Sequence, residues 1–93
     1  MEAPKSIPEI LGTLTRQEII VLKLAADDLT NQKIAAELGV SLLTIKSHRR
    51  HISLKAGVKG VAEIRKFIRE ATPYLKNTTF LLLFYYLSRI VGA

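Results

Sequence analysis

The sequence predicts an all-α protein with four helices in one small domain, followed by an additional hydrophobic C-terminal helix. Three observations lead to this prediction. Apolar residues recur at the spacing of amphipathic helices, hydroxyl-bearing residues precede these segments as N-caps, and glycine follows two of them, at Gly39 and Gly57. No segment has a convincing strand pattern. A chain of 93 residues has room for one modest core, so a single domain must carry the function.

Residues 1–13 are expected to form an N-terminal arm with a single helical turn at 6–11. Pro4 and Pro8 lie in this arm, which lacks the basic and apolar run of a signal peptide, so we expect a cytoplasmic protein. Because only 13 residues precede Leu14, we expect no receiver or sensor domain ahead of it.

The first long helix is expected at 16–26. Thr15 can cap its N-terminus, and Glu18 stands three residues later, as in a capping box. Leu14 and Ile19 have the spacing of a hydrophobic staple across the same helix start.

The next two helices are expected at 31–38 and 42–56. Thr30 is the N-cap candidate of the first, and Gly39 is suited to end it in the left-handed conformation. Ser41 can cap the second helix directly afterwards, which leaves only a tight corner between the two. This spacing is typical of a helix-turn-helix.

Helix 42–56 has two different faces at helical periodicity. The inward face is expected to hold Ile45, His48, Ile52 and Ala56. The remaining, largely cationic side is formed by Lys46, Arg49, Arg50 and Ser53. One face would therefore pack on the core while the other stays available for an anionic partner.

A fourth helix is expected to begin at Gly60, with Ile64, Phe67 and Ile68 facing inward. Thr72-Pro73 is expected to separate it from the tail, because proline interrupts helices. The predicted organisation is thus an arm, a domain over 14–71, and a C-terminal extension over 72–93.

The C-terminal extension is the unusual part of the sequence, because every residue from 80 to 87 is apolar. A helix over 74–91 would be apolar on nearly every face, which favours a homodimer through one stripe. The stripe consists of Phe80, Leu83, Phe84, Leu87 and Ile90. The alternatives are packing against Ile19 and Ile20 of the same chain, a different partner, or membrane association. At roughly 24 Å, a helix over 78–93 is short for the ~30 Å hydrocarbon core, so a membrane is the less favoured alternative.

The net charge of +6 is concentrated in the middle of the chain. Residues 30–69 contain nine lysines and arginines against two glutamates, whereas residues 1–29 contain three basic and five acidic residues. A local positive field favours a polyanionic partner. There is no cysteine, and His48 and His51 lack a third metal ligand, so we expect neither a metal site nor a cofactor. Without a nucleophile and base or a paired-carboxylate pattern, we expect no enzyme.

An ordered series of residues carries a family resemblance. It comprises Leu14-Thr15, Glu18, Val21-Leu22, Leu29 to Asn31, Ile34-Ala35, Leu38, Val40-Ser41, Thr44 to Lys46, His48, Ile52, Lys55 and Gly57-Val58. With this series, residues 14–71 resemble the LuxR-type helix-turn-helix family, which includes NarL-like, FixJ-like and GerE-like regulators. The sequence departs from the family pattern at Gln17, Ile19-Ile20, Lys33, Ala56 and Val61.

The resemblance implies a transcription regulator that binds double-stranded DNA with helix 42–56 in the major groove. Lys46, Ser47 and Arg50 would then face the bases. Phosphate contacts are expected from groups at helix N-termini and along the same helix. These are Thr30, Asn31, Ser41, Thr44, Arg49, His51 and Lys55.

Two other functions are compatible with the sequence. Residues 44–47 are similar to the promoter-reading region of sigma factors, so RNA polymerase is a possible partner, although His48 and the segment 55–58 favour the LuxR type. The domain could also act through protein contacts of its hydrophobic tail, with an incidental basic face.

Overall fold

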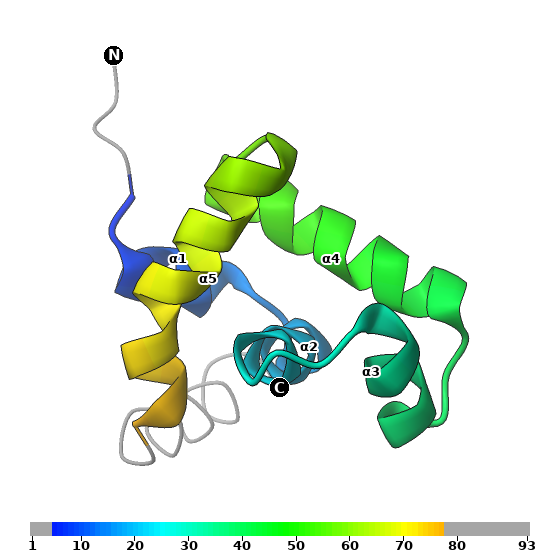
Figure 1. Ribbon diagram of the computed structural model, residues 1–93. Coiled ribbons are helices and arrows are strands. Elements are labelled where there is room, and N and C mark those ends of the chain that lie inside the picture. The colour runs from blue at the N-terminus through cyan, green and yellow to red at the C-terminus, as the bar shows by residue number, and fades with distance from the viewer. Residues whose placement is uncertain (1–4, 78–93) are drawn as a thin grey trace.

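The computed structural model describes residues 5–77, and all regular secondary structure in this range is helical (Figure 1). The five helices are α1 (Ile7–Thr13), α2 (Arg16–Ala26), α3 (Asn31–Leu38), α4 (Leu42–Ala56) and α5 (Gly60–Lys76). The prediction of an all-α helix-turn-helix fold is confirmed. The dimer stripe predicted at Phe80, Leu83, Phe84, Leu87 and Ile90 lies outside the described residues.

The predicted caps set the starts of three helices. The hydroxyl of Thr15 accepts the backbone N–H of Glu18, that of Thr30 accepts the N–H of Lys33, and that of Ser41 accepts the N–H of Thr44. Each bond satisfies a donor that an α-helix leaves unpaired in its first turn. The helices expected at about 16–26, near 31–38 and at 42–56 are confirmed by the observed bounds.

Glycine ends both helices of the helix-turn-helix. Gly39 and Gly57 have φ values of 66° and 70°, a left-handed conformation that a side chain would strain. Only three residues separate α3 from α4, and the two helices pack against each other.

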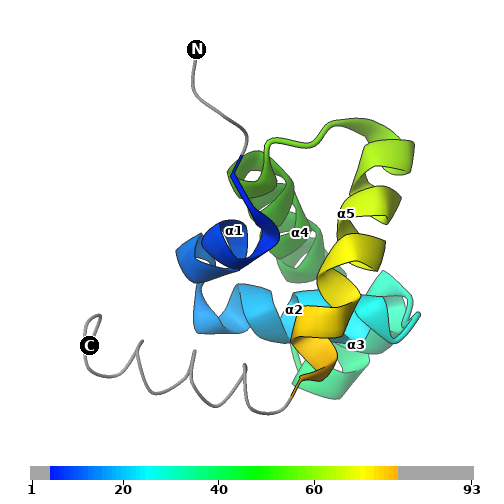
Figure 2. The same cartoon turned by 90° about the vertical axis from the view of Figure 1, so that its left-hand side faces the viewer.

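The N-terminal segment is more ordered than the single turn expected at 6–11. Helix α1 extends from Ile7 to Thr13 and begins with a capping box between Ser6 and Glu9. Ile10 and Leu11 are buried, and α1 packs against α4 and α5 (Figure 2). Residues ahead of Leu14 therefore contribute to the core.

The core lies around α2, which packs against α3, α4 and α5. The largest fully buried side chains come from every helix and are Leu11, Val21, Leu22, Ile34, Ile45 and Leu75. In Figure 1, α4 runs along the upper edge of the molecule, with α3 at one of its ends and α5 at the other. This arrangement leaves the side of α4 that faces away from α2 open.

The break predicted at Thr72-Pro73 is wrong, because α5 continues through Pro73 to Lys76. Proline lacks the N–H of a helical hydrogen bond. Tertiary packing offsets this loss, since Ala71 and Leu75 on either side of Pro73 are fully buried. The predicted start at Gly60 is confirmed, and of the residues expected to face inward Phe67 is buried while Ile64 and Ile68 are half-buried.

Candidate nucleic-acid interface

The open side of α4 carries three side chains that were predicted to contact bases. Ile45 and Ile52 are buried, which fixes the rotation of the helix on the core. On the opposite side Lys46, Ser47 and Arg50 are exposed. Neither Lys46 nor Arg50 forms an ion pair within residues 5–77, so both charges are available to a ligand.

Two leucines that sequence analysis did not single out lie on the same open side of α4. Leu43 and Leu54 are 76% and 68% exposed, the two highest values among the exposed large hydrophobic residues. Leu43 precedes Ser47 by four residues and Arg50 by seven, so helical periodicity places all three on one stripe. The same periodicity, applied outward rather than inward, would have found Leu43 in the sequence.

Hydroxyl and amide groups gather at the N-termini of α3 and α4, as expected. Thr30 and Ser41 cap these helices, and the Ser41 and Thr44 hydroxyl oxygens lie 2.9 Å apart. Asn31 is the first residue of α3 and is half-buried. The free backbone donors of a helix N-terminus favour phosphate oxygens at such positions.

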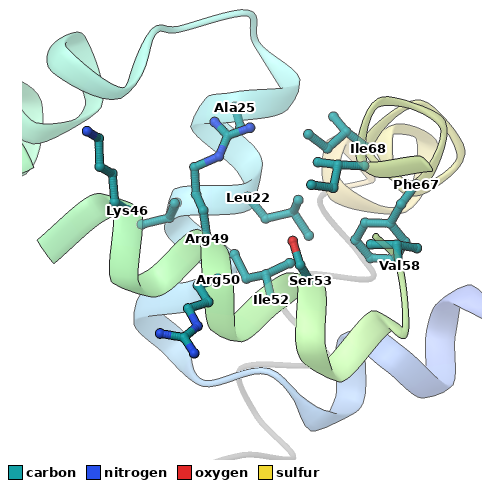
Figure 3. Close-up of a pocket in the computed structure, with 12 residues that line it drawn as sticks. Leu22, Ala25, Lys46, Arg49, Arg50, Ile52, Ser53, Val58, Phe67 and Ile68 are labelled. Atoms are coloured by element: carbon teal, nitrogen blue, oxygen red, sulfur yellow. The ribbon is translucent and has the colours of Figure 1, made fainter. Parts of the chain in front are cut away.

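Arg49, expected to contact phosphate, has a partner within the protein. Its guanidinium donates to the side-chain oxygen of Asn31 over 3.0 Å, which links α4 to the start of α3. Partial burial lowers the pKa of Arg49. In Figure 3, the Arg49 side chain extends toward Ala25 of α2, whereas the Arg50 side chain points away from Ala25.

Lys55 and His51, also expected to contact phosphate, lie next to a buried carboxylate. Lys55 Nζ is 2.7 Å from Glu18 Oε1, and His51 Nδ1 is 3.8 Å from Glu18 Oε2. His51 is largely exposed, while the Lys55 side chain is one-third exposed. The basic residues of α4 thus form two groups. Lys46 and Arg50 are exposed, whereas Arg49 and Lys55 bond to α3 and α2 and hold the helices together.

A hollow of about 230 Å³ opens beside α4, between that helix and α2 and α5. Its floor is apolar, from Leu22, Ile52 and Phe67, and its α4 edge carries Lys46, Arg49 and Arg50 (Figure 3). Within residues 5–77 no three histidine or acidic side chains gather as a metal site would require. In the same range no helix is long and apolar enough to cross a membrane.

A tight helical corner followed by a helix with a buried apolar side and an exposed basic side defines a helix-turn-helix DNA-binding domain. Residues 12–67 match the family described as bacterial regulatory proteins, luxR family. The chain belongs to this family, and the resemblance drawn from residues 14–71 is confirmed. None of the solved structures matches the chain significantly.

The chain is similar to several bacterial proteins, two of which are named as regulatory proteins. Nodulation protein W of Bradyrhizobium diazoefficiens is 34% identical over 59 residues, which are 63% of this chain and 26% of that protein. Transcriptional regulatory protein TdiR of Thauera aromatica is 27% identical over 74% of this chain and 30% of its own length. Oxygen regulatory protein NreC of Staphylococcus aureus is 35% identical over 58% and 25%, respectively. The chain thus spans about a quarter to a third of these relatives.

Proposed function

We propose that this chain regulates transcription by binding a specific double-stranded DNA sequence with α4 in the major groove. The observation that carries the proposal is the division of α4 into a buried side at Ile45 and Ile52 and an exposed side at Lys46, Ser47 and Arg50. The major groove admits one α-helix, so the exposed side would meet base edges.

The exposed side chains provide complementary chemistry. Lys46 and Arg50 can donate to the O6 and N7 acceptors of guanine, and Ser47 can donate or accept. Leu43 at the start of the stripe can cover the methyl group of a thymine, which is an apolar feature of the same groove. This combination supports a site that contains both guanine and thymine.

Phosphate contacts would hold the helix in register. Thr30 and Asn31 at α3 and Ser41 and Thr44 at α4 stand beside helix N-termini, and His51 is exposed on the flank of α4. We also propose phosphate contacts for Arg49 and Lys55. Their bonds to Asn31 and Glu18 add a second role, which is to fix α4 relative to α3 and α2.

A dimer through the C-terminal residues would present two copies of α4. The apolar stripe from Phe80 to Ile90 supports this part of the proposal from the sequence alone. Two recognition helices about 34 Å apart would meet successive major grooves, so operator affinity would depend on dimerisation.

Selection of bound sequences from random DNA tests the proposal. The parent chain should enrich a defined motif, and Arg50→Ala should relax the preference at one base pair while weakening binding by roughly 1 to 3 kcal/mol. Lys66→Ala, which removes a charge from α5, is the control and should leave the motif intact. Recovery of unenriched DNA by the parent chain would overturn sequence-specific binding.

A further inference from the structure

A second basic surface lies beside α4, on the side where α5 and the turn from α2 to α3 approach it. A hollow of about 480 Å³ opens there. Arg49 of α4 and Arg65 and Arg69 of α5 line it, together with Thr30 at the start of α3. Three arginines from two helices therefore line one concave surface.

The residues that line this hollow carry a net positive charge. Arg65 and Arg69 are exposed, stand four residues apart on one side of α5, and form no ion pair within residues 5–77. Asp28 is the single carboxylate among the lining residues, against three arginines. Like charges that line a concave surface concentrate a positive potential, which attracts an anion.

This hollow adjoins the smaller one beside α4. Ala25, Arg49 and Ile68 line both this hollow and the smaller one whose edge carries Lys46 and Arg50. The basic side chains of α4 and α5 thus border a single surface. When a helix enters the major groove, the two sugar-phosphate strands run along its flanks, and one of them would cross this surface.

We propose that the groove formed by Arg49, Arg65 and Arg69 binds backbone phosphates of the DNA whose major groove α4 occupies. The inference rests on the proposed function and extends the DNA contact surface from the helix-turn-helix to α5. Arginine suits this role because its planar fork can donate two hydrogen bonds to one phosphate. Phosphate contacts are independent of the base sequence, so the groove contributes affinity and orientation rather than base preference.

The experiment compares two double variants that remove the same charge from the full chain. The groove variant combines Arg65→Gln with Arg69→Gln and removes two positive charges from the groove. Lys5→Gln with Lys66→Gln is the control, since both lysines line a different hollow between α1 and α5. Binding to the selected DNA is measured across a series of salt concentrations, after thermal unfolding has shown that both variants fold.

The slope of log K against log salt is negative, and in the groove variant it should become less negative by about 1.8, because each lost phosphate contact removes about 0.9 from its magnitude. The control variant should keep the parental slope, and both should select the parental motif. An unchanged slope in the groove variant, or an equal drop in both variants, overturns the phosphate groove while leaving the proposed function standing. Failure of the parent chain to select any motif removes both.

Discussion

Lys55 Nζ donates to Glu18 Oε1 over 2.7 Å and thereby joins the last turn of α4 to the first turn of α2. The same Glu18 oxygen accepts the backbone N–H of Thr15 as part of the capping box. Only 3% of Glu18 is exposed, so the negative charge of its carboxylate is stabilised by these two donors instead of by water. One carboxylate therefore both caps the start of α2 and positions the helix that carries the proposed DNA-binding surface.

Glu18→Gln should lower the free energy of unfolding by about 1 to 3 kcal/mol, because it removes a charge-assisted hydrogen bond and weakens a cap. Urea denaturation measures the change. Glu9→Gln is the matched control, since Glu9 occupies the same place in the exposed capping box of α1 and should cost less than about 1 kcal/mol. Equal losses in the two variants would contradict a special role for the Lys55 contact.

Glu18 should make the free energy of unfolding decrease as the pH is lowered into the acid range. Burial by itself raises the pKa of Glu18, but hydrogen bonds from Lys55 and Thr15 and the charge of Lys55 outweigh burial and lower it below the usual 4.5. Glu18 thus contributes stability that is complete above the unfolded-state pKa and is lost as pH falls through the lower folded-state value.

The measurement is the difference in unfolding free energy between the parent and Glu18→Gln as a function of pH. We expect this difference to be constant near neutrality and to shrink below about pH 4.5. A His51→Ala background removes the neighbouring histidine from the comparison. A difference that stays constant down to acid unfolding would refute the assignment.

In the parent chain the affinity for DNA should depend on the methyl group of one thymine in the selected site, and Leu43→Ala should remove this dependence. For the parent chain, replacing that thymine by uracil should weaken binding about fourfold. This factor corresponds to ~0.8 kcal/mol, the free energy gained by burying one methylene-sized group. The Leu43→Ala chain should bind both DNAs equally. Leu54→Ala, at the other end of the exposed side of α4, should respond to uracil as the parent does. If no thymine shows this dependence on Leu43, the contact does not exist.

Replacing Leu83 and Leu87 by lysine should convert the proposed dimer into a monomer that binds a single half-site weakly. Burial of each such side chain contributes roughly 1.5 to 3 kcal/mol, so two charges in the stripe should suffice. Sedimentation at micromolar concentration gives the oligomeric state. A truncation for the same purpose belongs after Asn77 and not at Thr72, because Leu75 is part of the core. A monomeric parent chain would disprove the dimer.

Local patterns predicted the positions of α2, α3 and α4. Their starts depend on a hydroxyl and a backbone N–H three residues apart, at Thr15, Thr30 and Ser41. These interactions form within one turn of chain, so short-range sequence specifies them. The outward position of Lys46 and Arg50 followed from helical periodicity for the same reason, whereas that of Ser47 was expected from the family resemblance.

Tertiary structure decided what depends on residues far apart in the chain. The burial of Ala71 and Leu75 carries α5 past Pro73 against the local preference of proline, and the burial of Ile10 and Leu11 accompanies the extension of α1 to Thr13. The partners of Arg49 and Lys55 lie 18 and 37 residues away. Such pairings depend on how the helices cross, which the packing of the whole core determines and no local pattern encodes.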